Sequence, residues 1–335
     1  MASYKEIFGT NIEVLASDPA NPVTGQVWYN STDNVVKGFV VTTAGAWATA
    51  NDMNTGRIAL GDAGSQTAAL GFGGSVPPVT GATESYNGTS WTEVNDLNTS
   101  RDSLVGAGTQ TSALGYGGNG PPELGVTESW NGTSWTEVND LNSARRLAAG
   151  GGADNTNAIC FAGFNPAALP TGGLTVTETW NGTSWTEVND MNTSRVELAA
   201  ATVTNTAALG FGGNRPPGTN PSGLTESWNG TSWTEVNDLN TARQGLAGAG
   251  TYTAGLGIGG AYNDPVVLVA NTEEWNGTSW TEVNDLNTAR TGDFGGAGTT
   301  TAGLAFSGIN PATGRTAATE EWNSPSSTTV TFTDS

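Results

Sequence analysis

The chain has 335 residues and a formal net charge of −20, with 31 acidic and 11 basic residues. So few cationic side chains cannot neutralise a phosphate backbone, and we expect no nucleic-acid binding. Histidine is absent, which excludes serine–histidine–aspartate catalysis and histidine metal sites. No apolar run approaches the length of a membrane span, and no charged-then-apolar leader opens the chain, so neither a membrane span nor a signal peptide is predicted.

Residues 1–45 are predicted to form an attachment module outside the repeats. Within them, 25–30 and 35–41 have the composition of two short strands, joined by the polar turn 31–34. A small β-meander of this kind is only marginally stable by itself and needs a partner surface. We therefore expect residues 1–45 to bind another protein.

The rest of the chain, 46–335, is dominated by the segment WNGTSWTEVNDLN, which is intact at 130–142, 228–240 and 275–287. Near-copies start at Tyr86 and Trp180, and a degenerate copy ends in an arginine at 57. Every copy leads into an arginine, so the repeats start near Arg57, Arg101, Arg145, Arg195, Arg243 and Arg290. This period, about 44 to 50 residues, is typical of propeller blades.

Each period predicts four short antiparallel strands. In the repeat that starts at Arg101, the expected strands are 103–108, 112–118, 126–130 and 133–138. Asn131–Gly132 separates the last two, and this dipeptide is a strong signal for a two-residue hairpin turn. A four-stranded meander repeated around an axis is a β-propeller blade.

The sequence predicts an all-β, six-bladed propeller whose sixth blade is incomplete. That blade begins at Arg290 and lacks a tryptophan-bearing fourth strand, which either 46–50 or 328–333 could supply. We favour 46–50, because it carries Trp47 and would join the two ends of the ring, removing an exposed strand edge.

Variation in repeat length is confined to the loop between the second and third strands. These loops are 75–82, 119–125, 164–175, 214–223, 261–270 and 309–317. Insertions on one face of a repeat protein often mark its binding face, while the alternative is a set of length-tolerant surface loops. The candidate ligand-binding residues on these loops are Pro121, Glu123, Asn165, Asn214, Arg215, Tyr262, Asp264, Asn310 and Arg315.

The residues that recur in every repeat are interpreted as structural. They are the repeat arginines together with Trp91, Trp135, Trp185, Trp233 and Trp280. We expect each arginine to bind backbone carbonyls or a neighbouring carboxylate such as Glu93 or Glu137. The alternative is that the arginines converge on an anionic ligand.

No catalytic residue, metal site or cofactor is predicted. Cys160 lies in an apolar run and is interpreted as a buried, inert thiol. The segment 95–98 and its copies offer oxygen ligands but lack the spacing of a calcium loop, so turn capping is the interpretation. Every repeated acid occurs in every blade, whereas a catalytic carboxylate pair would be singular.

The order of arginine, Gly–Gly strand end, Glu-x-aromatic and tryptophan resembles the kelch repeat over residues 46–323. Gly73–Gly74, Gly117–Gly118, Gly212–Gly213 and Gly259–Gly260 supply the doublets. Asn21–Ser31 is similar to leaders of marine phage virion structural and tail-fibre-like proteins. These resemblances imply a structural protein at the surface of a virion, as a tail fibre, baseplate appendage or capsid decoration. It would contact other virion proteins through 1–45 and a host-surface glycan or protein through its variable loops. The alternatives are a purely structural spacer, a glycan-degrading enzyme and a cellular extracellular adhesin.

Overall fold

The computed structural model describes residues 12–43, 45–120, 122–168, 170–218, 220–262 and 267–332. It divides into two compact units: the N-terminal residues up to Ala46 together with the chain from Ser324, and the ring formed by Trp47–Asn323. None of the described residues forms a helix long and apolar enough to cross a membrane.

The first unit is a four-stranded sheet with the order β1 (Glu13–Leu15), β2 (Val27–Asn30), β3 (Val35–Thr43) and β32 (Ser326–Phe332). The sequence predicted only two strands of this sheet, β2 and β3, and the structure adds one strand on each side. The strand β1 adds in parallel to β2, and β32 pairs with β3. The assignment of the whole of 46–335 to the propeller was therefore wrong at its C-terminal end, because β3 offers its free edge to this distant strand.

The exposed Asp18 links side chains of β2 and β3 in this first unit. Its carboxylate accepts hydrogen bonds from the buried Trp28 indole and from Asn30, and it forms an ion pair with Lys37. The bonds from Asn30, Lys37 and Trp28 lower the pKa of Asp18 to about 2.

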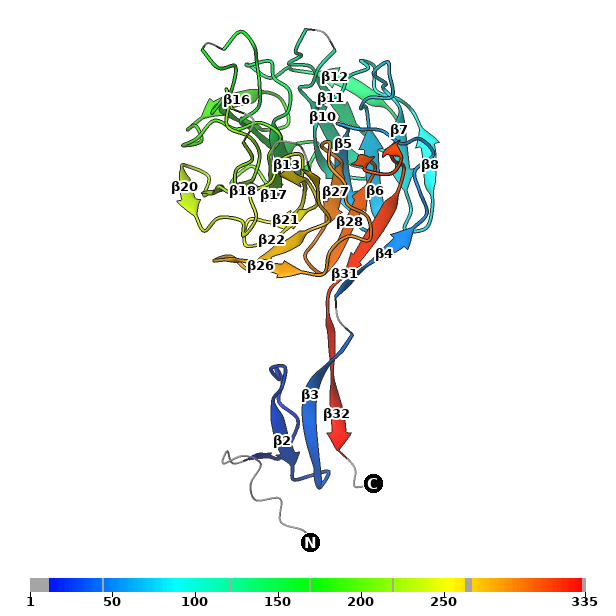
Figure 1. Ribbon diagram of the computed structural model, residues 1–335, viewed down its shortest axis with the longest axis vertical. Helices are drawn as coiled ribbons and strands as arrows, with labels where there is room; N and C mark the ends of the chain where they lie inside the picture. Colours follow the sequence, from blue (N-terminus) through cyan, green and yellow to red (C-terminus); the bar gives the residue numbers. More distant parts are fainter. Residues whose placement is uncertain are drawn as a thin grey trace. The chain divides into compact units, whose positions relative to one another are not determined.

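The second unit contains, within the described residues, six four-stranded antiparallel sheets, which we call blades one to six (Figure 1). Their strands are β5 (Gly61–Ser65), β6 (Ala68–Phe72), β7 (Thr83–Tyr86) and β8 (Trp91–Val94) in blade one; β9 (Val105–Thr109), β10 (Ser112–Tyr116), β11 (Thr127–Trp130) and β12 (Trp135–Val138) in blade two; and β13 (Ala149–Asp154), β14 (Asn157–Phe161), β15 (Thr177–Trp180) and β16 (Trp185–Val188) in blade three. They continue with β17 (Ala199–Thr204), β18 (Ala207–Phe211), β19 (Thr225–Trp228) and β20 (Trp233–Val236) in blade four; β21 (Ala247–Thr251), β22 (Ala254–Ile258), β25 (Thr272–Trp275) and β26 (Trp280–Val283) in blade five; and β27 (Gly295–Gly298), β28 (Ala302–Phe306), β31 (Thr319–Asn323) and β4 (Ala46–Ala50) in blade six.

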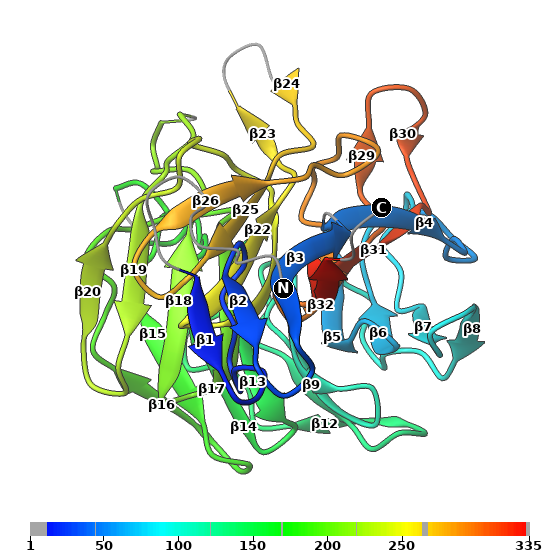
Figure 2. The same ribbon diagram turned by 90° about the horizontal axis from the view of Figure 1, so that it is seen from below.

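The ring closes on itself. The first strand of each blade contacts the first strand of the next, and β27 of blade six contacts β5 of blade one. The strand β4 lies beside β31 and completes blade six, as favoured from the sequence (Figure 2). The all-β, six-bladed architecture is therefore confirmed.

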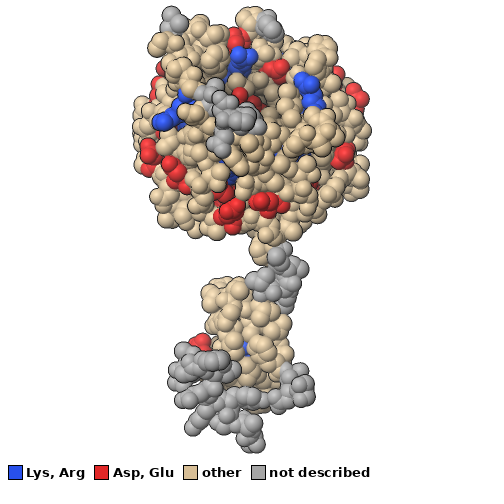
Figure 3. Space-filling view, in the orientation of Figure 1, with Lys and Arg blue, Asp and Glu red and all other residues tan. Residues whose placement is uncertain are grey.

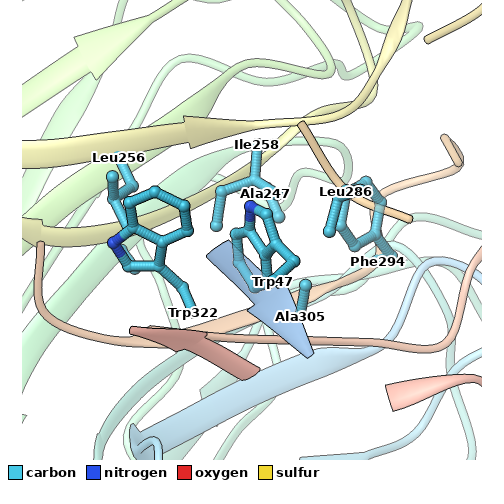
Figure 4. Packing of buried hydrophobic residues seen from close by; sticks show 9 residues of the cluster. Trp47, Ala247, Leu256, Ile258, Leu286, Phe294, Ala305 and Trp322 are labelled. Atoms are coloured by element: carbon cyan, nitrogen blue, oxygen red, sulfur yellow. The ribbon is translucent and has the colours of Figure 1, made fainter. Parts of the chain in front are cut away.

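The apolar core lies between neighbouring blades. In Figure 4, Trp47 and Trp322 of blade six pack against Leu256 and Ile258 of blade five. Each fourth-strand tryptophan also donates its indole N–H to a threonine on the third strand of the preceding blade, at 3.0 to 3.2 Å. The six pairs are Trp91–Thr319, Trp135–Thr83, Trp185–Thr127, Trp233–Thr177, Trp280–Thr225 and Trp47–Thr272. Every interface in the ring thus contains the same buried polar contact within an aromatic layer.

The repeat arginines are fully buried, and each donates to backbone carbonyls as expected, whereas the carboxylate partner differs from the ones expected. The carboxylates of Glu93 and Glu137 lie on exposed outer-strand positions. Each arginine instead pairs with the glutamate of its own blade's third strand, where alternation turns the side chain inward. The pairs are Arg57–Glu84, Arg101–Glu128, Arg145–Glu178, Arg195–Glu226, Arg243–Glu273 and Arg290–Glu320.

The same glutamate also holds the chain that enters the blade. Arg195 lies 3.0 Å from Glu226 Oε1, while Glu226 Oε2 accepts the backbone N–H of Asn192 at 2.8 Å. The equivalent contact recurs in all six blades. Because the guanidinium groups are engaged inside the blades, they do not converge on a ligand.

Candidate ligand-binding face

The loops between second and third strands share one face of the ring, which we call the variable-loop face. The residue after each repeat arginine forms a bridge with the residue that follows the glycine at the end of the second strand. Examples are Ile58 with Ser75 and Arg146 with Phe164. The variable loops therefore begin beside the connections between blades, at the strand ends opposite the Asn–Gly turns. Two of them contain short hairpins, β23 (Ala261–Tyr262) with β24 (Val267–Leu268) and β29 (Ile309–Asn310) with β30 (Gly314–Arg315), which extend beyond the four-stranded sheets (Figure 2).

A ring of hydrogen bonds surrounds the axis at this face. The second residue after each repeat arginine donates its N–H to the equivalent carbonyl of the preceding blade, as Ser103 does to Ala59 at 2.7 Å. Blade six is the exception, where the Thr291 hydroxyl donates to Gly245 O at 3.2 Å. The participating residues are Ala59, Ser103, Leu147, Glu197, Gly245, Thr291 and Gly292. This mouth ring connects all six blades and gives the face a rigid base.

The structure uses several of the sequence-predicted candidates to shape the loops themselves. Asn165 donates to Ala144 O at 2.8 Å, and Asn310 Oδ1 accepts the N–H groups of Ala312 and Thr313. Asn214 is buried, and its amide donates to Glu197 Oε2 at 3.3 Å. Asn165 and Asn310 therefore position backbone, and Asn214 is engaged with another side chain inside the protein.

The remaining candidates are distributed over different blades. Glu123 forms an ion pair with Arg146, and Arg315 donates to Ser75 O across the boundary between blades six and one. Arg215 is exposed, and Tyr262 is half-buried on β23. Pro121 and Asp264 lie outside the described residues. The candidates thus form no single pocket among the described residues.

Two charged residues were not singled out from the sequence, Arg146 at the variable-loop face and Asp62 on the axis. Arg146 directly follows the repeat arginine Arg145. Asp62 occupies a first-strand position where the other blades carry Gly106, Gly150, Ala200, Gly248 and Gly296. For Asp62, the departure of one blade from its copies was a signal available before the structure, whereas the position of Arg146 differs in every blade and gave no such signal.

Asp62 lies on the axis of the ring. Two cavities of about 100 Å³ each are lined by residues in or next to the first strands of all six blades, and Asp62 contributes to both. Burial raises the pKa of Asp62 to about 7, although its carboxylate accepts the N–H of Gly296 at 3.2 Å. At the mouth, burial and the neighbouring carboxylates of Glu197 and Asp102 raise the pKa of Asp293 to about 8.

The raised pKa of Asp62 predicts that the ring loses stability as the pH rises. The folded protein keeps this proton up to about pH 7, whereas the unfolded chain releases it near the ordinary value of 3.8. We expect Asp62→Asn to be more stable than the parent above pH 7, by roughly 2–4 kcal/mol, and the advantage to vanish below pH 4. Urea unfolding of both proteins from pH 4 to pH 8.5 measures it.

Asp154 supplies a control of opposite sign. Hydrogen bonds from the Thr156 side chain and backbone lower the pKa of its carboxyl. Its ionised form therefore stabilises the parent above the ordinary pKa of 3.8, and Asp154→Asn is expected to be less stable than the parent above about pH 4 and equal to it at lower pH. A parallel pH response of the two variants would contradict the role assigned to Asp62.

Comparison with known proteins identifies the architecture. No protein-family model and no curated protein matches the chain. The solved structure of YjhT is similar, with a TM-score of 0.70 and 10% sequence identity, over 85% of this chain and 99% of that one. The chain folds as a β-propeller. At this identity the likeness shows the propeller fold alone.

Among the described residues, the side chains that most often ligate metal ions are aspartates, glutamates and one cysteine. No group of three or more aspartate, glutamate or cysteine side chains among them could hold a metal ion. Cys160 is fully buried between blades two and three, and burial raises the pKa of its thiol to about 12. Cys160 is thus the buried, weakly reactive thiol expected from the sequence.

Proposed function

We propose that the chain is a non-enzymatic structural protein of a phage particle, a tail fibre or other appendage exposed at the particle surface. It displays a propeller of kelch-like repeats, which contacts a host-surface glycan or protein through the variable-loop face. The observation that carries this proposal is that repeated side chains hold the ring together while changes in length gather on one face.

The geometry of the propeller suits display. The chain enters the ring at the start of β4 and leaves it at the end of β31, which are both at the face of the Asn–Gly turns. The variable-loop face therefore carries neither entry nor exit of the chain. Surface loops on a rigid scaffold are where binding residues concentrate.

The attachment role of residues 1–45 is part of this proposal. Its support is the leader-like run at 21–31 and the small four-stranded sheet that these residues build with β32. A sheet of this size exposes Val14, Val23 and Phe332, which a neighbouring virion protein would cover.

Exchange of the variable loops tests the proposal. Particles that carry the chain would be prepared with the six loops replaced by one short loop sequence, and host adsorption would be measured. We expect adsorption to fall by more than tenfold. The matched control replaces the exposed threonines of the opposite face by alanine, at Thr89, Thr133, Thr183, Thr231 and Thr278, and is expected to leave adsorption unchanged.

Two results would overturn the proposal. Unchanged adsorption after loop exchange would leave a structural spacer or capsid decoration. Release of reducing sugar from host polysaccharide by the purified chain would indicate a glycan-degrading enzyme.

A further inference from the structure

The accessible positive charge of the propeller lies on one face. Between Trp47 and Asn323 the sequence has nine arginines and no lysine, and six of these arginines are buried in the glutamate pairs. The other three, Arg146, Arg215 and Arg315, all lie on the variable-loop face. Exposed acids recur on the outer strands of blades one to five, at Glu93, Glu137, Glu187, Glu235 and Glu282. In Figure 3 most of the few blue side chains of the propeller lie in its upper part, with red ones both beside them and over the rest of the surface.

Two of these arginines belong to loops that touch. Phe164 bridges both Arg146 and Gly173. Gly173 packs on Pro216 so closely that an added Cβ would lie 2.8 Å from the proline ring. Arg215 precedes Pro216 in the loop of the next blade. We call Arg146, Phe164, Gly173, Arg215 and Pro216 the two-arginine patch.

The arginines of this patch have guanidinium N–H groups that could donate hydrogen bonds to a ligand. The Arg146 guanidinium lies 5.3 Å from the Phe164 ring centroid, and the arginine side chain is 32% exposed, although its Nε is buried. Its Nε is 3.5 Å from Glu123 Oε1, too far for a strong hydrogen bond. Arg215 is exposed, and its guanidinium makes no hydrogen bond or ion pair with any described residue. Planar guanidinium groups bind carboxylates and sulfates in pairs of parallel hydrogen bonds.

We propose that the two-arginine patch binds an acidic polysaccharide, with Arg146 and Arg215 paired to its carboxylate or sulfate groups. This inference rests on the proposed function, because it takes the variable-loop face to be a binding face. A nucleic acid is disfavoured, since its binding needs many more cations than three.

A protein partner is also disfavoured by the surface of the patch. Protein interfaces are anchored by aromatic and large apolar side chains together with arginine, and beside its two arginines the patch has only the half-buried Phe164 as an aromatic. The exposed large apolar residues described in the propeller are Val203, Tyr252 and Val267, and none belongs to the patch. The two-arginine patch therefore suits a polar polymer of repeating units, which needs only a few charged hydrogen-bond donors, better than it suits a protein.

The negative charge elsewhere does not prevent this contact. At physiological ionic strength, charges more than about 8 Å apart are largely screened, so the acids of the outer strands act weakly at the patch. An arginine in direct contact with an anionic group of the ligand is screened much less, because the two are joined by hydrogen bonds. The affinity of one patch is expected to be modest and to gain from many copies on one particle.

The test measures binding of the purified full chain to three probes: polyuronate oligosaccharides, dextran sulfate and neutral dextran. We expect binding of polyuronate or of dextran sulfate, which separates the carboxylate source from the sulfate source, and no binding of dextran. Arg215→Gln and Arg146→Gln are each expected to weaken the affinity about tenfold. Arg315→Gln is the matched control, because it removes the same charge from the same face outside the patch, and its affinity is expected to stay within twofold.

Each contrary result would overturn the inference. Absence of binding to both acidic probes would exclude acidic polysaccharides as the ligand class. If Arg315→Gln lowered the affinity as much as the patch variants, the binding would be non-specific charge attraction rather than recognition by the patch. Equal binding of polyglutamate would point to an acidic protein instead. Arg215 is exposed, so its variant tests the patch even if Arg146→Gln disturbs the fold. The two proposals can fail separately. If the variants change binding as expected but particle adsorption is unchanged after loop exchange, the polysaccharide site stands and the proposed role in host contact is excluded.

Discussion

An Arg145→Ala variant is expected to lose about 3–5 kcal/mol of unfolding free energy, because it strands a buried carboxylate. Arg145 is fully buried and pairs with Glu178, whose other oxygen holds the chain entering the blade. Arg146 is the matched control, since it is the next residue and its ion pair with Glu123 is partly exposed. For Arg146→Ala we expect a loss below about 1 kcal/mol. Urea unfolding of both variants measures the difference.

The double variant Arg145→Met, Glu178→Leu separates pairing from packing. Removal of both charges leaves no unpaired carboxylate in the core, so we expect it to regain most of the stability lost in Arg145→Ala. Equal losses for Arg145→Ala and Arg146→Ala would show that the buried network contributes nothing specific to the ring.

A Trp47→Ala variant is expected to lose about 3–5 kcal/mol of unfolding free energy and to loosen the closing strand. Trp47 is buried beside Trp322, with ring centroids 5.7 Å apart, and donates to Thr272 in blade five at 3.0 Å. The strand β4 is held in blade six by these contacts and its pairing with β31. When β4 leaves, β31 becomes an open edge that can pair with other chains.

Trp135 is the control for this second variant. It has the same position and the same indole-to-threonine bond, but its strand follows β11 directly through an Asn–Gly turn. We expect Trp135→Ala to lose similar stability without concentration-dependent association. Size-exclusion chromatography over a range of concentrations makes the comparison, and association of both variants alike would argue against a special role for β4.

Much of the propeller was predictable because each repeat contains the turn residues and strand patterns that specify one blade. Asn131–Gly132 and its copies specify the hairpin, and the spacing from Arg57 to Arg101 and onward specifies one blade per period. The missing tryptophan strand of blade six pointed to Trp47 by its residue type alone. These are local signals, and the copies reinforce one another.

The errors concern contacts between segments far apart in the chain. Glu93 and Glu128 have similar local surroundings in the sequence, and only the inward or outward turn of their strands decides which one meets an arginine. The pairing of β32 with β3 joins residues nearly 300 positions apart, for which no repeat provides a register.

The candidate site divides in the same way. The sequence identified the loops and Arg215, because loop length varies where the scaffold permits it. It did not show that Asn165 and Asn310 accept backbone N–H groups of their own loops, or that Phe164 places Arg146 beside the loop of Arg215.

By itself, the sequence determined the all-β class, the number of blades, the strand order within each blade and the face on which the variable loops emerge. Turn residues and strand alternation act over a few positions and therefore remain readable along the chain. Only the tertiary structure decided the arginine partners, the mouth ring, the placement of Asp62 on the axis and the contact between the loops of blades three and four. Those depend on how neighbouring sheets pack, which the closed ring imposes and no local pattern encodes.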